Sequence, residues 1–283
     1  MQQTGRISCV GVSDTLAPPS QPARPLFAGV GASQAGNVSM TPLILIPTRM
    51  AATRLPGKPL ADIGGKAMIV RAWEKAMESG LPVAVAAGDP EIVAAIAAVG
   101  GRAVLTDPEL PSGSDRVLAA LETLDPDGEY DAIINLQGDM PLADPGIAMA
   151  CAALLHGEPS CDIATLVAPE SDPSDRTNVD VVKAVLAIEE GHRHGRALYF
   201  TRSTLYGDAP VWRHIGVYGY RREALKRFCA APPSPLEMRE KLEQLRALEM
   251  GLSIWATVIA EAPISVDNPA DLEAARRLAI GDP

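Results

Sequence analysis

Three cations follow the first apolar segment of the sequence, at spacings that would let them face one ligand. Arg49, Arg54 and Lys58 lie in residues 47–60, among small residues that allow a backbone to approach a ligand closely. The apolar run at 43–47 is typical of a buried central strand. Because ligands of open α/β sheets bind beyond the carboxyl ends of the strands, we expect this loop to bind a polyphosphate.

Two carboxylates stand where further strands are expected to end. Asp139 follows the apolar run at 131–136, and Asp267 precedes a helix start at Asn268-Pro269. Read singly, each could be an ordinary turn or helix-start acid. Mg²⁺ favours one or two carboxylates together with substrate phosphates. With the cationic loop, the pair is a coherent set for metal-assisted nucleotidyl transfer.

Two common phosphate-binding motifs do not fit the loop. A P-loop requires GxxxxGK[ST], but Ala52 stands at the first glycine position and Pro59 follows Lys58. A dinucleotide fingerprint requires GxGxxG between a strand and a helix. The glycine pair at 29–31 has no strand before it. A surface loop with ordinary solvated cations remains the alternative.

Short apolar runs alternate with helical patterns along the rest of the chain, which predicts βαβ units and a mostly parallel sheet. Helix starts are marked by an acceptor followed by proline at Asp89, Asp144, Ser234 and Asn268. Residues 170–214 interrupt the alternation, and we interpret them as an insertion or flap that could carry a dimer contact. The expected strands are 43–47, 82–87, 102–105, 131–136, 161–167, 181–188, 215–220 and 254–259.

Composition excludes several classes of protein. A net charge of -10 argues against a nucleic-acid partner. No apolar run reaches the roughly 18 residues of a membrane span, so no membrane partner is expected. Four dispersed cysteines indicate a reducing compartment, and the absence of a His/Cys cluster leaves an oxygen-held metal.

Residues 1–39 differ in composition from the remainder. They are rich in Gly, Pro, Ser, Gln and Ala, and they show no sustained period. We interpret them as a disordered tail, or as translation assigned from too early a start with Met40 as the functional one. Residues 40–283 are then expected to form a single domain, as active and stable from Met40 as in the full chain.

Seven motifs occur together, in order and at matching spacing. They are TRLPGKPL at 53–60, SGSDR at 112–116, QGDMP at 137–141, ALYFTR at 197–202, RHIGVYGYR at 213–221, SPLEMREKLEQLR at 234–246 and VDNPADL at 266–272. Over about residues 42–280 the chain resembles the 3-deoxy-manno-octulosonate (Kdo) cytidylyltransferases.

The resemblance implies a three-layer α/β/α sandwich of the GT-A-like nucleotidyltransferase type, with Mg²⁺ as cofactor. It implies a cytoplasmic homodimer that transfers CMP from CTP to the anomeric hydroxyl of Kdo, giving CMP-Kdo and pyrophosphate. The product would feed lipopolysaccharide synthesis.

The resemblance also implies residue roles. Lys58, Asp139 and Asp267 would be catalytic, with the two carboxylates holding the metal. CTP would be bound by Arg49, Arg54, Lys58, Ser112, Gly113 and Arg116, and the sugar by Gln137, Arg202, His214, Tyr218, Glu243 and Gln244. Without the resemblance, Arg202 would be interpreted as a member of a surface ion pair and His214 as a hydrogen-bonded imidazole in the core.

Some positions depart from the family pattern and keep alternatives open. Met140 stands where common members have Glu, and Ala52 where they have Ser. Another acidic sugar, such as a sialic acid or 8-amino-Kdo, is the nearest alternative substrate. A non-catalytic nucleotide-binding protein is a third reading, which the retention of Asp139 and Asp267 disfavours.

Overall fold

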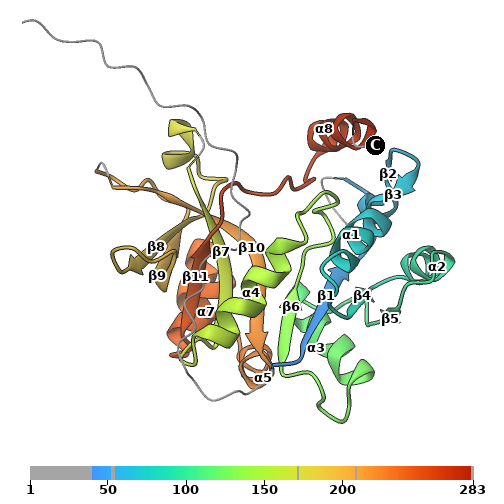
Figure 1. Cartoon of the computed structure of the whole chain (residues 1–283), viewed down its shortest axis with the longest axis horizontal. Helices are drawn as coiled ribbons and strands as arrows, with labels where there is room; N and C mark the ends of the chain where they lie inside the picture. The colour runs from blue at the N-terminus through green and yellow to red at the C-terminus, as the bar shows by residue number, and fades with distance from the viewer. Residues whose placement is uncertain (1–39, 52–54, 171, 208, 282–283) are drawn as a thin grey trace, which may run out of the picture. The chain divides into compact units, whose positions relative to one another are not determined.

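The computed structural model describes residues 40–51, 55–170, 172–207 and 209–281 (Figure 1). The described residues belong to one compact unit. The interpretation of residues 1–39, the predicted role of Arg54 and the departure at Ala52 all fall outside the described residues. No helix in the described ranges is long and apolar enough to cross a membrane.

A single sheet runs through this unit, with the strand order β5-β4-β1-β6-β10-β7-β11-β9-β8. A separate pair, β2 (Asp62–Ile63) and β3 (Lys66–Ala67), follows the first loop. The strands of the main sheet are β1 (Pro42–Thr48), β4 (Val83–Ala87), β5 (Ala103–Leu105), β6 (Ala132–Asn135), β7 (Ile163–Pro169), β8 (Lys183–Ile188), β9 (His194–Thr201), β10 (Trp212–Arg221) and β11 (Ile254–Val258).

The sheet is mixed, which corrects the expectation of a mostly parallel one. β5, β4, β1 and β6 pair in parallel, as do β7 and β11. β10 lies antiparallel between β6 and β7, and β9 lies antiparallel to β11 and β8. Parallel neighbours need a long crossover, usually a helix. In the described part of residues 170–211 the only helical element is the short η2 (Pro173–Arg176), so the strands there pair antiparallel.

The segment expected as a flap contributes two strands to the sheet. β8 and β9 form a hairpin that continues the sheet beyond β11. Trp212 and Arg213 at the start of β10 pair with β7 on one side and with β8 on the other. The strands β10, β7, β11, β9 and β8 therefore close into a ring at this point.

Helices cover both faces of the sheet because β1 is apolar on both sides. Ile44 and Ile46 belong to one core cluster and Leu43 and Leu45 to the other. The first cluster includes α1 (Met68–Met77), α2 (Pro90–Ala98) and α4 (Gly146–Gly157), and the second includes α3 (Gly113–Leu124), α5 (Arg222–Ala230) and α7 (Gln244–Glu249). The remaining helices are η1 (Lys58–Leu60), α6 (Pro235–Glu240) and α8 (Pro269–Ile280), and α8 packs near β2 and β3 (Figure 1).

Candidate active site

Lys58 brings the two predicted metal carboxylates together. Its Nζ lies 2.8 Å from Asp139 Oδ2 and 3.4 Å from Asp267 Oδ1. Lys58 opens η1 after the loop that leaves β1, Asp139 follows β6, and Asp267 precedes α8. β1 and β6 are adjacent parallel strands, so their carboxyl ends meet at one edge of the sheet. Three segments distant in sequence thus meet where the sequence predicts a ligand crevice.

The turn that carries Asp139 depends on close backbone approach. A Cβ on Gly138 would lie 3.3 Å from the carbonyl oxygen of Pro47 and 3.3 Å from Cβ of Thr48. Glycine therefore allows this turn to pack against the end of β1. The backbone N–H of Val266 donates to the Asp139 carbonyl at 2.9 Å, which holds the Asp267 segment beside the turn.

The helix start at α8 also orients Asp267. Asn268 and Asp271 form a capping box, and the Asp271 carboxylate additionally accepts from the Asp267 N–H at 2.9 Å. Asp271 is a supporting residue that our sequence reasoning missed. The pattern of Asn followed three residues later by an acid, which marks a capping box, was the available signal.

The donor set at this point suits a hard divalent cation. Among the described residues no group of three or more His, Cys, Asp or Glu side chains forms a metal site. Asp139 and Asp267 are carboxylate donors of the kind that Mg²⁺ takes, since it binds one or two carboxylates and completes its shell with phosphates and water. Asp139 and Asp267 would therefore hold a metal together with a bound triphosphate.

The N-terminus of α3 faces the same loop. Ser112 caps the helix by accepting from the Asp115 N–H at 3.2 Å. A Cβ on Gly113 would lie 3.5 Å from Pro47, so the helix begins against the end of β1. A helix N-terminus favours anionic groups. Arg49, at the start of the loop, is exposed.

Arg116, which is predicted to bind CTP, is buried and bonded within the protein. It is only 2 % exposed, and its guanidinium donates to Thr106 Oγ1 at 2.6 Å and to the carbonyls of Asp107 and Pro108 at 3.0 and 3.2 Å. These bonds hold the segment between β5 and α3. The structure thus places Arg116 beneath the predicted nucleotide segment, where it fixes backbone.

A pocket of about 270 Å³ brings together three of the predicted sugar residues, His214, Tyr218 and Gln244. The rings of His214 and Tyr218 are 5.5 Å apart. The other lining residues are Asp180, Val181, Val182, Arg213, Gly216 and Leu242. Arg213, whose guanidinium lies 3.7 Å from Asp175, is a pocket residue that our sequence reasoning missed, although it directly precedes His214 on β10.

His214 meets this pocket as a neutral ring. Burial lowers the pKa of His214 from its usual 6.5 to about 3. Its Nε2 lies 3.1 Å from Thr165 Oγ1, and Thr165 Oγ1 lies 2.9 Å from the Val217 carbonyl. The register of β10 against β7 shifts between Ile215 and Tyr218, which marks a bulge of the kind that redirects side chains near functional sites. His214 can therefore offer hydrogen bonds but no charge at neutral pH.

Arg202 lies behind this pocket. Its Nη1 donates to the carbonyls of Val179 and Asp180 at 3.1 and 3.3 Å. The fully buried Lys183 donates to the carbonyls of Asn178 and Arg202 at 2.5 and 2.9 Å. Burial lowers the pKa of Lys183. Both cations therefore hold the backbone that forms the pocket rim, and the structure does not place Arg202 among the lining residues.

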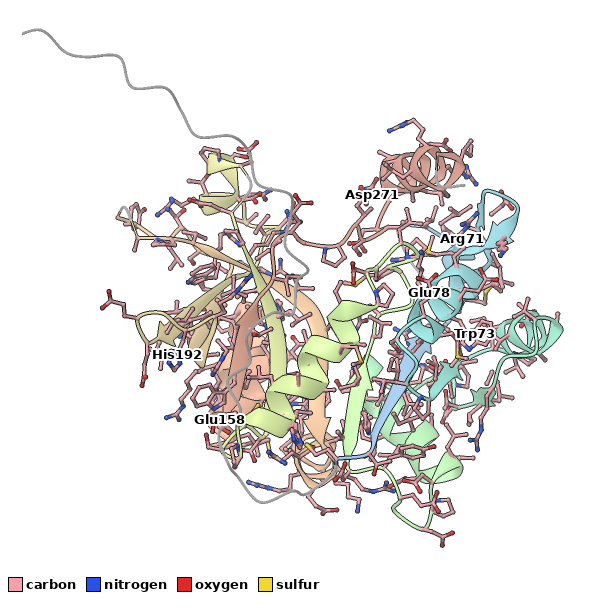
Figure 2. The ribbon with its side chains drawn as sticks, viewed as in Figure 1. Arg71, Trp73, Glu78, Glu158, His192 and Asp271 are labelled. Carbon is pink, nitrogen blue, oxygen red and sulfur yellow. The ribbon has the colours of Figure 1, made fainter. Side chains whose placement is uncertain are left out.

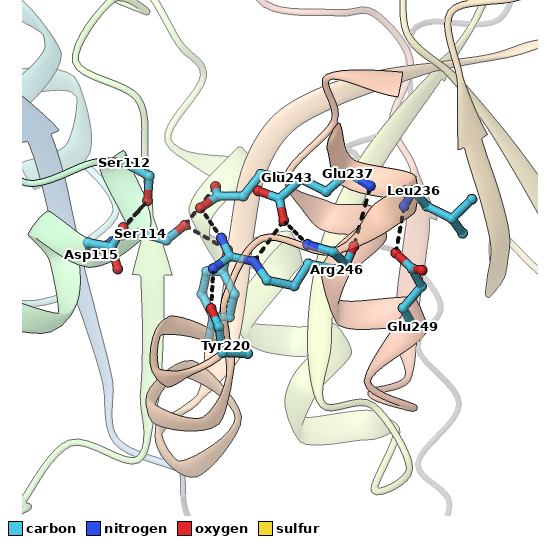
Figure 3. Close-up of polar contacts among 11 residues, drawn as sticks. Ser112, Ser114, Asp115, Tyr220, Leu236, Glu237, Glu243, Arg246 and Glu249 are labelled. Atoms are coloured by element: carbon cyan, nitrogen blue, oxygen red, sulfur yellow. Dashed lines mark hydrogen bonds and ion pairs between the residues drawn. The ribbon is translucent and has the colours of Figure 1, made fainter. Parts of the chain in front are cut away.

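Glu243 belongs to a polar network that joins α7 to the start of α3 (Figure 3). Its carboxylate accepts from Ser114 Oγ at 3.2 Å and from Arg246 Nη2 at 2.9 Å. Arg246 also lies 3.1 Å from Glu237, and Ser114 lies 3.3 Å from the Tyr220 hydroxyl. Burial raises the pKa of Glu243. Glu243, a predicted sugar residue, thus connects residues 112–116, which are predicted to bind the nucleotide, with residues 234–246.

Gln137 lies in the turn that follows β6, two residues before Asp139. Its amide donates to Asn135 Oδ1 at 3.1 Å, and Asn135 pairs with Tyr218 in the β6–β10 register. Gln137 is therefore placed between Asp139 and the pocket strand. Met140 is 6 % exposed and belongs to the apolar core, so its departure from the family pattern adds a core side chain at this turn.

A second cavity, of about 580 Å³, lies elsewhere on the molecule. It is lined by His192, Tyr206 and Trp212, with apolar residues of β8 and of the segment before β10. Figure 2 shows His192 well separated from Asp271, which bonds the Asp267 segment. This cavity is therefore distinct from the carboxylate site.

Sequence and structure comparisons agree on the relatives of this chain. The family described as Cytidylyltransferase matches residues 43–254. A 3-deoxy-manno-octulosonate cytidylyltransferase of Parvibaculum lavamentivorans is 57 % identical over 83 % of this chain and 91 % of its own length. That of Paramagnetospirillum magneticum is 54 % identical over 84 % and 98 %. A solved CMP:2-keto-3-deoxy-manno-octonic acid synthetase in complex with CTP is 35 % identical, with a TM-score of 0.78 over 86 % of this chain and 100 % of that one.

Proposed function

The chain belongs to the 3-deoxy-manno-octulosonate cytidylyltransferase family, and from this premise we propose that it transfers CMP from CTP to Kdo. The observation that carries the proposal is the meeting of Lys58, Asp139 and Asp267 at the carboxyl end of β1 and β6. A cation between two carboxylates, beside a helix N-terminus, provides charges of both signs for a triphosphate and its metal.

In the proposed reaction the anomeric hydroxyl of Kdo attacks the α-phosphorus of CTP. An oxygen–phosphorus bond to the sugar forms, the bond to pyrophosphate breaks, and the hydroxyl proton passes to solvent water. Bound Mg²⁺ would supply positive charge at the phosphates and acidify the attacking hydroxyl. Arg49 and Lys58 neutralise the triphosphate, and catalysis is mainly positioning and charge neutralisation.

The pocket beside β10 supports an acidic sugar as the acceptor. Arg213 contributes a cation, while His214, Tyr218 and Gln244 contribute hydrogen-bonding groups. Asp180 contributes an acceptor for sugar hydroxyls. Because the pKa of His214 is about 3, we assign the charge that meets the sugar carboxylate to Arg213.

The decisive experiment measures pyrophosphate release with CTP, Mg²⁺ and each of three acidic sugars. We expect Kdo to give the highest kcat/KM, with sialic acid and 8-amino-Kdo well below it. Faster turnover of either competitor would show that this competitor, and not Kdo, is the preferred substrate. No release with any of the three sugars would favour the non-catalytic reading.

Several further properties form part of the same proposal. A GT-A-like three-layer fold fits the two helix layers on the mixed sheet. A homodimer, to be checked by light scattering, would account for the exposed apolar residues near the second cavity, where Tyr206 is 92 % exposed.

Among the described cysteines Cys151, Cys161 and Cys229 are free thiols, which supports a reducing compartment such as the cytoplasm. Lipopolysaccharide synthesis is the proposed destination of the product.

A further inference from the structure

Asp89 makes a hydrogen bond that its position at a helix start does not explain. Its Oδ2 accepts from the backbone N–H of Met50 at 2.7 Å, across 39 residues of sequence. The N-terminus of α2, which it precedes, has no side-chain cap bond. At two further Asp-Pro helix starts the carboxylate bonds locally: Asp144 accepts at 2.6 Å from the N–H of Gly146, and Asp172 accepts at 2.7 Å from the N–H of Ser174, in each case two residues ahead. The carboxylate of this dipeptide therefore bonds within its own turn at Asp144. At Asp89 it bonds to the start of the loop at residues 47–60, which is expected to bind phosphates and is called the phosphate loop below.

The junction of β4 and α2 packs directly against the start of that loop. The N–H of Gly88 donates to the Thr48 carbonyl at 2.9 Å. A Cβ on Gly88 would lie 2.9 Å from Cβ of Arg49 and 2.9 Å from Nη1 of Arg116. No larger residue fits there without displacement, so the glycine permits close contact between the junction, the loop and Arg116.

Asp89 also balances charge at this junction. Burial, and after it the charge of Arg49, lower the pKa of Arg116, and the charges of Asp89 and Asp107 oppose that effect. Arg116 in turn holds the carbonyls of Asp107 and Pro108 ahead of α3. The Asp89 carboxylate thus bonds to the Met50 backbone of the phosphate loop. It also lies near Arg116, whose pKa responds to both Asp89 and Arg49.

We propose that Asp89 is a positioning residue that holds the backbone at residues 48–50 in the geometry that binds the nucleoside triphosphate. The proposal rests on the proposed function for the identity of that ligand. Asp89 acts through its bond to the Met50 N–H, so it contributes to CTP affinity without lining the pocket beside β10. Ordering the loop before the ligand arrives reduces the conformational entropy lost on binding.

The test compares Asp89→Ala, Asp89→Asn and Asp144→Ala. Asparagine retains an oxygen that can accept from Met50, whereas alanine removes both the acceptor and the charge. We expect Asp89→Ala to raise the Kd and KM for CTP about tenfold, with the KM for Kdo unchanged. Asp89→Asn should stay within about threefold of wild type, and Asp144→Ala should leave both KM values unchanged.

Hydrogen exchange and direct binding separate positioning from general stability. The Met50 amide should exchange faster in Asp89→Ala than in wild type, and Asp89→Asn should restore its protection. Wild-type CTP affinity in a folded Asp89→Ala variant would overturn the proposal. If Asp89→Ala fails to fold, a tenfold loss of CTP affinity in folded Asp89→Asn, with the Met50 amide still protected, would overturn it as well. CTP binding by titration calorimetry does not need turnover, so absence of transfer to Kdo would count against the proposed function alone.

Discussion

At the scale of single residues, the site is defined by opposite charges held within a few ångströms. Lys58 is 15 % exposed at its side chain, against 26 % for Asp139 and 41 % for Asp267. The lysine is thus the most shielded member, and the carboxylates retain faces toward solvent where a metal and phosphates can enter. Removal of either carboxylate should therefore affect chemistry more than stability.

Asp139→Asn tests this expectation, because asparagine keeps the shape and removes the charge. We expect kcat/KM to fall by about 10³-fold, since a metal ion contributes several kcal/mol to such reactions. The melting temperature should change little. Pyrophosphate release and circular dichroism are the measurements, with Asp127→Asn on an exposed turn as the control. Undiminished turnover in the Asp139 variant would refute the metal role.

Arg213→Met tests which cation meets the sugar carboxylate. Loss of a charge-assisted hydrogen bond of about 1.5–3 kcal/mol should raise the KM for Kdo roughly 10- to 100-fold. The KM for CTP should be unaffected. Lys226→Met, which removes an exposed cation paired with Glu223 on α5, serves as the matched control. An unchanged KM for Kdo in the Arg213 variant would show that a group other than Arg213 binds the sugar carboxylate.

At the scale of elements, short backbone contacts determine where the functional side chains lie. The capping box of α8 fixes Asp267 through Asp271, and the tight turn at Gly138 fixes Asp139 against β1. In the same way, Lys183 and Arg202 hold carbonyls behind the pocket beside β10. Supporting groups of this kind usually matter for geometry more than for charge.

Asn268→Ala tests the contribution of the α8 cap. We expect about 1 kcal/mol of lost unfolding free energy, the usual cost of removing an N-cap. Because the cap also orients Asp267, kcat should fall severalfold. Asn268→Ser should recover most of both quantities, since serine is a good N-cap. Urea unfolding and initial rates are the measurements, and a stability loss with full kcat would separate the cap from the site.

At the scale of the whole molecule, burial of His214 links folding to pH. The pKa of His214 is about 3 in the folded chain and near 6.5 when unfolded. Between these values the unfolded state binds one more proton, so this residue makes stability fall as pH decreases from about 6.5. The slope from one such group is at most about 1.4 kcal/mol per pH unit.

Urea unfolding of wild type and His214→Gln between pH 7 and pH 5 measures this effect. The difference between the two proteins isolates the histidine from other groups, such as Glu243, whose raised pKa acts in the opposite direction. We expect the variant to lose less stability on acidification than wild type. Parallel curves for the two proteins would show that His214 is protonated in the folded state.

Much of the site was predictable because its determinants are local or depend on recurring motifs. Asp139 and Asp267 stand directly beside elements that the sequence marks clearly, and the structure brings both to Lys58. Arg116 and Arg202 have the same residue types as ligand-binding cations, yet they donate to backbone carbonyls. An arginine side chain is long enough to do either, so sequence position does not reveal which acceptor it meets.

The sequence by itself determined the membership in the cytidylyltransferase family, the two carboxylates and the loop cations, because these depend on residue type and order. Only the tertiary structure decided that β10 lies antiparallel between β6 and β7, that Asp89 accepts a hydrogen bond from Met50 and caps no N–H of its own helix, and that Arg213 lines the pocket beside β10. The physical reason is that hydrogen-bond partners far apart in sequence are chosen by the path of the chain, which residue type and spacing do not encode.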